Sequence, residues 1–500
     1  MSDRNEQEGE EGAAPDSGEA QILADRRAKL EGLRADGIEP FPHSFPGRNL
    51  IAEVRSAHEG LADGEETDDA YRLAGRITAR RGMGKAAFLD LADGSGGIQL
   101  QSRSDVLGAE GHERLLKMDL GDFVGIDGTA FKSRRGELSL RVTAWQPLAK
   151  SLRPLPDKYH GLTDVEARYR RRELDLIANP EVRELFVARS KAIAAIRRWL
   201  DERDFIEVET PVLQPVYGGA LAEPFSTHHN ALGRDLYLRI ATELYLKRYI
   251  IGGIERVYEL GKDFRNEGVS HKHNPEFTML EWYEAYADYT DNAKRLEAMV
   301  ASICEQVTGS TEVQRGEEIL DFSPPWRRVT LRDAVADHAG VDLDASPSRQ
   351  ELCEALGSDP GSDQGWGKVL DHLFGKKVEP ELIQPTFVTD YPVELSPFAK
   401  SHRTKPGTVE RWEAFCGGIE IANSFTELND PDEQRRRFEA QAAEIARGDA
   451  EAHPFDEDFL RAMEQGMPPT GGVGLGIDRL VMMLTGAASL REVLLFPAMR

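Results

Sequence analysis

The stretch from Phe264 to Tyr289 predicts a β-hairpin whose second strand carries both acids and aromatics on one face. Residues 259–264 and 277–283 have the composition of strands, and residues 266–275 form the loop between them. Alternate side chains of a strand share a face, so this face combines Phe277, Met279, Glu281 and Tyr283. A buried carboxylate without a cationic partner costs several kcal/mol. We infer that the missing partner is a ligand.

The composition is typical of a globular enzyme with roughly two to four domains. Of the 500 residues, 40% are hydrophobic and 30% are charged. No apolar run approaches the ~20 residues of a membrane span, so we expect no membrane association. Residues 1–20 contain seven acids and one arginine, which predicts a disordered acidic tail rather than a targeting peptide. The three cysteines are widely separated, and we therefore expect a cytoplasmic protein.

The formal net charge of −25 argues at first against a nucleic-acid partner, because phosphate binding needs local positive charge. The distribution of charge is uneven, however. Residues 71–155 contain 14 Lys or Arg and 9 Asp or Glu. A locally basic segment of this kind can still bind RNA.

The pattern along the chain predicts several segments. Residues 21–65 form an N-terminal helical extension, and residues 66–150 contain five short alternating strands separated by glycine-rich turns. Such strands favour a small barrel of the OB type, with a β-sandwich fragment that binds no ligand as the alternative. Residues 151–176 form a basic, proline-punctuated linker. Residues 177–500 form a larger domain of mixed helices and strands, with a helical insertion near residues 311–379.

Two further segments carry chemistry. The sequence GGVGLGIDRL at 471–480 differs from a dinucleotide-binding loop in its glycine spacing, and too few residues follow it for a βαβ unit. Its glycines therefore let the backbone approach a ligand, with Arg479 at the start of the next helix.

In residues 411–431, Asn423, Phe425 and Glu427 share a strand face downstream of Glu413 and Glu420. These last two acids are either surface charges or, beside a triphosphate, ligands of Mg²⁺.

These segments resemble the conserved motifs of the class II aminoacyl-tRNA synthetases, and specifically their lysyl-tRNA synthetase branch. The resemblance extends from about residue 25 to the C-terminus. It implies an α+β fold, with an N-terminal five-stranded OB-type β-barrel and a class II catalytic domain whose antiparallel sheet is flanked by helices. It also implies a homodimer, built by the helix at 182–204 and the strand at 205–212, that uses ATP, L-lysine and tRNA(Lys). The class I synthetases are excluded, since neither of their signature motifs is present.

The resemblance assigns an amino-acid site whose charges suit free lysine. Arg265 and Asn423 would bind the lysine carboxylate, and Glu243 with the backbone of Gly219 would bind the α-ammonium group. The ε-ammonium group would be held by Glu281, Glu427 and Tyr283, and Phe425 would also belong to the lysine site. The alternative is that these acids belong to a structural ion-pair cluster with Lys247 or Arg248.

The nucleotide site follows from the same resemblance. Glu267 would bind the adenine amino group, while Phe277 and Arg479 would sandwich the ring. His273, Asn274 and Arg265 would surround the phosphates, with Glu413 and Glu420 binding Mg²⁺. Arg265 and Arg479 are the expected catalytic residues, stabilising charge as the lysine carboxylate attacks the α-phosphate. His271 and His273 could suggest zinc, but no further His or Cys ligand is near in the sequence.

The resemblance places anticodon recognition on the barrel, at Arg80, Phe88, Gln99 and Glu137. An aromatic on a barrel face suits base stacking, although Phe88 alone would more often be a core residue. One departure from the family pattern is Glu223, which stands in GGALAEPF where an arginine is usual. The rivals are a ligase that modifies an elongation factor, an aspartyl or asparaginyl enzyme, and a non-catalytic RNA-binding relative. The first rival would lack the barrel, and the second would carry a cation where Glu427 stands. The third would have lost Arg265, Glu420 or Arg479.

Overall fold

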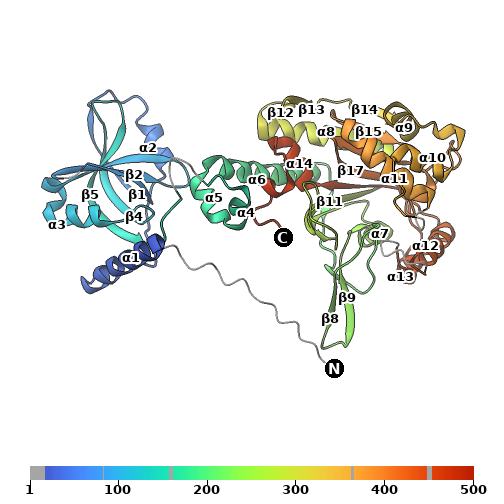
Figure 1. Ribbon diagram of the computed structural model, residues 1–500, viewed down its shortest axis with the longest axis horizontal. Helices are drawn as coiled ribbons and strands as arrows, with labels where there is room; N and C mark the ends of the chain where they lie inside the picture. The colour runs from blue at the N-terminus through green and yellow to red at the C-terminus, as the bar shows by residue number, and fades with distance from the viewer. Residues whose placement is uncertain (1–16, 83, 157–161, 362–364, 447–452, 500) are drawn as a thin grey trace. The chain divides into compact units, whose positions relative to one another are not determined.

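The computed structural model describes residues 17–82, 84–156, 162–361, 365–446 and 453–499. The chain divides into two compact units, Met1–Leu162 and Thr163–Arg500 (Figure 1). The expected disordered tail falls largely on residues outside these ranges. Its last four residues are helical, because α1 (Ser17–Ala35) begins at Ser17.

The first unit is a closed five-stranded barrel, as expected for an OB-type domain. Its strands have the order β1-β2-β3-β5-β4, which closes the sheet on itself and excludes the sandwich alternative. Alternate side chains such as Leu89, Leu91, Ile98 and Leu100 point inward and form the core. The elements of this unit after α1 are α2 (Ile51–Ala57), β1 (Glu66–Arg81), β2 (Ala86–Ala92), β3 (Gly97–Arg103), α3 (Ser104–Lys117), β4 (Phe123–Lys132) and β5 (Leu138–Ala149).

The second unit is built on an eight-stranded sheet of order β14-β15-β16-β17-β18-β11-β10-β6. Its central strands are antiparallel, and only the two edge pairs, β14 with β15 and β6 with β10, are parallel. The strands are β6 (Ile206–Glu207), β10 (Arg256–Phe264), β11 (Glu276–Ala285), β14 (Arg327–Thr330), β15 (Thr386–Thr389), β16 (Arg411–Cys416), β17 (Ile419–Thr426) and β18 (Thr470–Gly476). The predicted hairpin of residues 259–283 therefore lies inside the sheet, between β18 and the edge strand β6.

The two faces of this sheet have different roles. On one face Leu280, Trp282 and Leu475 pack against α6 (Pro180–Asp201), α8 (Tyr289–Thr308) and α14 (Ile477–Thr485) in the main hydrophobic core. On the other face, Val257 and Tyr283 contact α7 (Glu243–Ile251) through its residues Leu246 and Ile250. The acids of the hairpin lie on this second face, because they alternate with the core residues.

Three segment predictions need correction. The helical insertion at 311–379 also contains the hairpin β12 (Glu312–Arg315) and β13 (Glu318–Asp321), and its strand β14 joins the main sheet. The linker at 151–176 includes α4 (Val165–Arg170) and most of α5 (Arg172–Ala178), because Asp164 caps a helix there. The strand at 205–212 shrinks to the two residues of β6, since the donor-lacking Pro211 follows closely.

The remaining elements surround the sheet. The strands β7 (Leu213–Gln214), β8 (Ser226–His229) and β9 (Arg234–Leu238) form a small separate sheet, seen projecting from this unit in Figure 1. The helices of the insertion and the C-terminal region are α9 (Leu331–Ala339), η1 (Leu343–Ala345), α10 (Arg349–Leu356), α11 (Trp366–Lys377), η2 (Glu379–Glu381), η3 (Val393–Leu395), α12 (Pro431–Ala446), α13 (Glu457–Met463) and α15 (Leu490–Val493). None of the helices in the described ranges is long and apolar enough to cross a membrane.

Candidate active site and RNA-binding face

A row of polar residues crosses the open face of the catalytic sheet. Glu413 pairs with Asn423, Asn423 with Gly474, Gly474 with Glu281, and Glu281 with Glu259. Opposite residues of paired strands share a face, so five neighbouring strands form this row, with Gly474 at its middle. The missing side chain at Gly474 leaves space above the centre of the row.

A second row of paired residues explains why the position of Gly472, another glycine of the GxGxG segment, requires a residue without a side chain. Phe425, Gly472 and Tyr283 are paired across β17, β18 and β11. A Cβ atom at Gly472 would collide with Glu427 and with the Tyr283 ring. Gly472 thus makes room for side chains of neighbouring segments, whereas the approach of a ligand to the glycine backbone stays a prediction.

A buried ion-pair cluster lies between the sheet and α7. The Nζ atom of Lys247 is 2.5 Å from Glu243 Oε1 and 2.5 Å from Glu427 Oε2. The alternative prediction of an ion pair with Lys247 is therefore correct as geometry, whereas Arg248 pairs with Asp456 instead, at 3.6 Å. Burial raises the pKa of Glu427 to about 8, and the Lys247 charge opposes this rise. Among the described residues, neither Glu427 oxygen has a hydrogen-bond donor of good geometry.

Glu281 is held beside this cluster. Its Oε1 atom accepts a hydrogen bond from the backbone N–H of Thr242 at 3.1 Å, and Tyr283 donates its hydroxyl to Oε2 at 3.3 Å. Burial raises the pKa of Glu281 to about 8, and the neighbouring acids Asp263 and Glu243 raise it further. Burial also raises the pKa of Tyr283 well above its ordinary value, so the phenol remains a donor.

Sequence reasoning missed a second buried cluster next to Glu281. Arg239, which directly follows β9, forms ion pairs with Glu259, and with Asp263 at 3.1 Å. Burial raises the pKa of Asp263 to about 6, while Arg239 and Arg265 oppose the rise. The sequence pattern that could have revealed it is the shared parity of Glu259 and Asp263 on β10.

The predicted nucleotide residues surround the loop between β10 and β11. The Arg265 guanidinium lies 5.1 Å from the centre of the Phe277 ring. The Ser270 hydroxyl lies 3.0 Å from His273 Nδ1, at hydrogen-bond distance. Burial, and to a smaller extent the nearby Arg479 cation, lowers the pKa of His273 to about 4. Glu267 is exposed in the loop.

Asn274, by contrast, is already engaged in structural hydrogen bonds. Its amide donates to the Glu276 carbonyl at 2.6 Å and its oxygen accepts from the Ala498 N–H at 3.1 Å. The side chain thus ties the loop to the C-terminal end of the chain. We conclude that Asn274 shapes the loop that carries His273.

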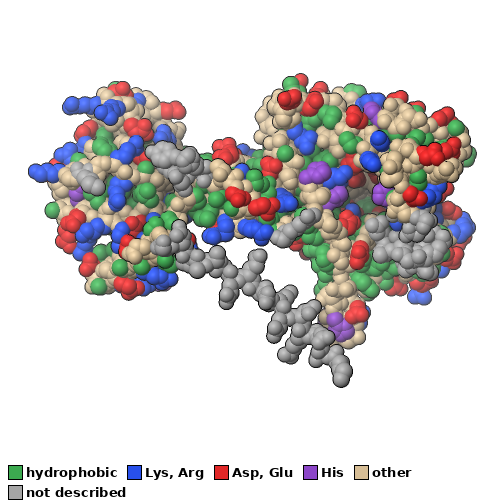
Figure 2. Space-filling model, in the orientation of Figure 1, with side chains coloured by type: hydrophobic (Ala, Val, Ile, Leu, Met, Phe, Trp, Pro, Cys, Tyr) green, Lys and Arg blue, Asp and Glu red, His purple; other side chains and the backbone are tan. Residues whose placement is uncertain are grey.

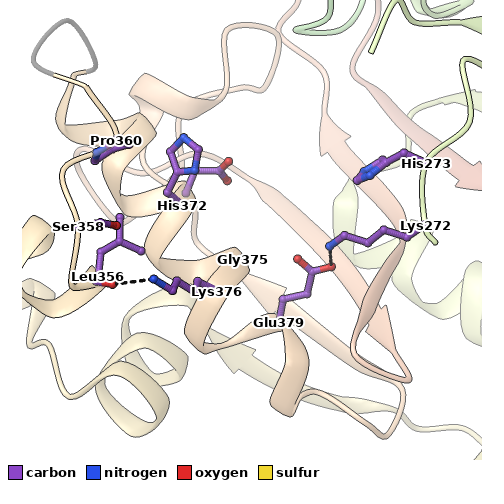
Figure 3. A pocket seen from close by; sticks show the side chains of 10 residues that line it. Lys272, His273, Leu356, Ser358, Pro360, His372, Gly375, Lys376 and Glu379 are labelled. Atoms are coloured by element: carbon purple, nitrogen blue, oxygen red, sulfur yellow. Dashed lines mark hydrogen bonds and ion pairs between the residues drawn. The ribbon is translucent and has the colours of Figure 1, made fainter. Parts of the chain in front are cut away.

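A cavity of about 530 Å³ opens beside this loop. Lys272 and His273 line one side, and Figure 3 shows His372 and Lys376 of α11 across from them. Lys272 pairs with Glu379 at 2.6 Å, so the insertion is linked to the loop by charge. None of the acids predicted to bind lysine lines this cavity, and in the described structure Glu243, Glu281 and Glu427 are buried.

The two predicted magnesium ligands lie near each other and each has a cation beside it. Glu413 pairs with Arg411 and accepts the Tyr391 hydroxyl at 2.8 Å, whereas Glu420 pairs with Arg479 at 2.9 Å. Burial and then the Glu420 charge raise the pKa of Glu413 to about 7, with Arg411 opposing. Within the described ranges, no group of three or more His, Cys, Asp or Glu could hold a metal. Two carboxylates fit Mg²⁺ only if phosphate oxygens complete its ligands.

The loop before α7 contributes backbone to the site. Gly219 has a φ of 89°, and a Cβ there would lie 2.9 Å from Glu243 Cβ. A glycine is therefore required for this close approach. Glu223, the departure from the family pattern, has an exposed side chain, and its carbonyl accepts a hydrogen bond from the Asn266 N–H at 2.8 Å.

On the barrel, the structure brings some of the predicted RNA-binding residues together and separates one. Phe88 is half-buried on the outer face of β2, so it is not a core residue. Gln99 of β3 is paired with Asp90, which lies two residues after Phe88 on the same face of β2. The Gln99 side-chain oxygen accepts a hydrogen bond from the Ser139 hydroxyl at 3.1 Å.

Arg80 has a different environment, since its guanidinium donates to the Met118 carbonyl at 3.2 Å at the end of α3. The arginine that shares the Phe88 face is Arg81, which is paired with Phe88 and bonded to Asp90 at 2.7 Å. Glu137 is exposed and lies 3.7 Å from Arg55. Figure 2 shows basic and acidic side chains interspersed over the visible face of this unit.

Comparison with known families agrees with both units. Residues 164–500 match the family described as tRNA synthetases class II (D, K and N), and residues 71–148 match the OB-fold nucleic acid binding domain. The sheet with its acidic row is therefore a class II synthetase domain, attached in the chain to a nucleic-acid-binding barrel.

The relatives define the amino acid. A lysine–tRNA ligase from Moorella thermoacetica is 51% identical over 487 residues, covering 96% of this chain and 98% of the relative. Those from Synechococcus sp. (strain CC9311) and Dehalococcoides mccartyi are 51% and 50% identical over 96% of the chain, covering 99% and 98% of their own lengths. The chain belongs to the lysine–tRNA ligases, the ATP-dependent enzymes that attach lysine to tRNA.

Proposed function

We propose that the buried acids of the catalytic sheet bind the two ammonium groups of L-lysine. The observation that carries this proposal is the burial of three acids close together. Glu243 and Glu427 share the Lys247 ammonium group, and Glu281 accepts the Tyr283 hydroxyl beside them. Glu243 with the Gly219 backbone binds the α-ammonium group. The ε-ammonium group contacts Glu281, Tyr283, Phe425 and Glu427.

The carboxylate of lysine and the triphosphate meet above the loop between β10 and β11. Arg265 and Asn423 bind the carboxylate and orient it toward the α-phosphate of ATP, and the guanidinium then stabilises the charge that develops there. Phe277 and Arg479 enclose the adenine, which Glu267 contacts through its amino group. His273 stays neutral at physiological pH and donates a hydrogen bond from its ring N–H to the phosphates.

Glu413 and Glu420 are the residues that would hold Mg²⁺. When bound, Mg²⁺ supplies positive charge that neutralises the phosphate oxygens. In its absence, Arg411 and Arg479 balance the two carboxylates. The acids therefore remain paired with a cation before and after the nucleotide arrives.

The magnesium assignment is tested by titrating Mg²⁺ in the lysine-dependent exchange of pyrophosphate into ATP. E420Q should raise the Mg²⁺ concentration needed for half-maximal rate by about tenfold, the effect of losing one charge-assisted contact. The control is E410Q, a buried acid paired with Arg403 at the neighbouring end of β16. An unchanged Mg²⁺ requirement in E420Q would remove Glu420 from the metal site.

We propose that the barrel binds the anticodon of tRNA(Lys). Phe88 provides a stacking surface and Gln99 a hydrogen-bonding group on the same face, with Arg80 and Glu137 at its margins. Arg81 joins this set because it is the basic residue adjacent to Phe88. Stacking with flanking polar contacts suits the unpaired bases of an RNA loop.

We also propose a cytoplasmic homodimer. Apolar side chains are exposed on α6 and around β6, with Val187, Ile206, Val212 and Leu213 each more than 40% exposed. Patches of this kind mark interaction sites. Light scattering at micromolar concentration should give twice the mass of 55.6 kDa. A fully active monomer would contradict the dimer.

A further inference from the structure

We propose that Lys247 is a positioning residue that favours the ionised forms of the acids in the lysine pocket and sets the charge of the pocket to that of one L-lysine. This inference rests on the proposed lysine site, because it concerns the same acids. Lys247 bridges Glu243 of α7 and Glu427, which follows β17, at 2.5 Å each. It is therefore a permanent ammonium ion among the acids that would bind a mobile one.

The Lys247 charge is wholly within the protein. Its side chain has no exposed surface, and its Nζ atom lies 5.3 Å from the centre of the Phe398 ring. A buried ammonium ion persists only where carboxylates compensate it. The two acids and the lysine thus stabilise one another's charged forms, and each depends on the others.

The number of charges in the pocket determines its specificity for lysine. The three acids Glu243, Glu281 and Glu427 carry three negative charges when ionised, and Lys247 balances one of them. The remaining two match the two ammonium groups of lysine, while Arg265 matches the carboxylate. An amino acid with a neutral side chain would leave one buried carboxylate without a cation, which is strongly unfavourable.

Lys247 also acts against protonation of the acids. Burial raises the pKa of Glu243 and Glu427, and the Lys247 ammonium opposes that rise in both. A protonated carboxyl would lose its ion pair with substrate. Without Lys247 the acids would ionise only at higher pH, so lysine binding would need higher pH as well.

Other titratable groups near the pocket do not supply this effect. Tyr283 and Glu281 face the cluster from β11, where burial keeps the phenol protonated and raises the pKa of Glu281. His453 faces it from the segment before α13, and burial lowers its pKa to about 4. Lys247 is thus the cation that α7 contributes to the cluster.

The test is K247M, which keeps the length of the side chain and removes its charge. Pyrophosphate exchange would be followed as a function of lysine concentration and pH. We expect the KM for lysine to rise at least about 30-fold near neutral pH, with the KM for ATP within about threefold. The pH midpoint of kcat/KM for lysine should rise by about one unit, so that alkaline pH partly restores activity.

The barrel offers a matched control in Lys150. It is also buried and bridges two acids, Asp119 at 2.6 Å and Asp122 at 2.9 Å. K150M should destabilise the protein while leaving the KM for lysine and its pH profile unchanged. If K150M reproduces the K247M profile, the effect is general destabilisation and the proposal fails.

Two more variants separate the possible failures. K247R keeps the charge, so its KM for lysine should stay within about fivefold of the parent with the same pH midpoint. If K247M does not fold, a folded K247R with KM raised more than 30-fold overturns the proposal. E427Q checks the pocket itself: if E427Q raises KM and folded K247M does not, only the role of Lys247 is wrong. If E427Q leaves KM unchanged, the proposed lysine site is wrong.

Discussion

The catalytic sheet and the barrel present their polar residues in opposite ways. On the sheet, Glu281 and Glu427 are almost fully buried, and glycines on the neighbouring strand provide the space around them. On the barrel, Phe88 and Gln99 are half-buried on the outer face, with the core packed behind them. The first arrangement suits a small molecule, and the second suits contact with an extended surface.

The difference matters because burial magnifies electrostatic effects. A charge inside the protein is costly unless paired, so a buried acidic pocket discriminates strongly between ligands of different charge. A half-exposed aromatic contributes about 1–3 kcal/mol per stacked base, whatever the base is. Substitutions on the sheet should therefore have larger and more specific consequences than substitutions on the barrel.

The largest effect is expected for Glu427→Gln, which removes a buried charge from the lysine pocket. The kcat/KM for lysine in pyrophosphate exchange should fall about 100-fold or more, because a charge-assisted hydrogen bond contributes up to about 3 kcal/mol. The matched control is Glu297→Gln, a buried acid of α8 on the opposite side of the sheet, which accepts a bond from the Trp326 N–H at 3.1 Å. A folded Glu427→Gln enzyme with near-normal kcat/KM would refute the assignment.

On the barrel, Phe88→Ala should reduce the kcat/KM for tRNA about 20-fold through lost base stacking. Lysine-dependent pyrophosphate exchange without tRNA should remain normal. Leu89→Ala provides the comparison, since this adjacent residue points into the core and its truncation costs about 2–5 kcal/mol of stability. Equal losses in both assays for Phe88→Ala would show that Phe88 supports the fold rather than the RNA.

The pH dependence of lysine activation should reflect the buried acids. The pKa values of Glu281 and Glu427 are raised to about 8, and the ionised forms bind the ammonium groups. Affinity is therefore lost as pH falls through this range, so kcat/KM for lysine should rise at least about eightfold between about pH 7 and about pH 8.5. The KM for ATP, measured in parallel, should change less. A profile for lysine that is flat over this interval would mean that the acids are fully ionised at neutral pH.

The smallest effect is expected for Glu223→Arg, because the Glu223 side chain is exposed. The KM for lysine should rise about threefold and the effect should shrink at high salt, where screening is stronger. The kcat should stay within about tenfold, a barrier change of roughly 1.4 kcal/mol or less. An inactive parent protein that regains adenylation with Glu223→Arg would show that the loop residue is essential.

Local patterns predicted the central elements well. The alternation of Phe277, Met279, Glu281 and Tyr283 determined both the strand and the face that it presents, because the period of two is a local property. The closed barrel and the excluded dinucleotide loop followed from similar short-range features. The fold class and the family were therefore recoverable before the structure.

Contacts between distant segments could not be predicted in the same way. The parity of Glu259 and Asp263 places both acids on one face of β10, but it does not show that Arg239, which follows β9, pairs with them. The Lys247 bridge to Glu427 spans 180 residues of sequence, so spacing alone does not decide between Lys247 and Arg248 as the partner of the acids. Arg80 and Arg81 are adjacent, and a bulge in β1 decides which one shares the Phe88 face. The strand at 205–212 was overestimated because only two of its residues find a partner in β10.

The central claim is that buried acids select the amino acid by the charge at the end of its side chain. Pyrophosphate exchange with L-lysine and with L-norleucine, which lacks the terminal amine, measures this directly. We predict that lysine supports rapid exchange and that the kcat/KM for norleucine is lower by at least about 1000-fold, since norleucine would leave a buried carboxylate unpaired. A kcat/KM for norleucine within about tenfold of that for lysine would contradict the account.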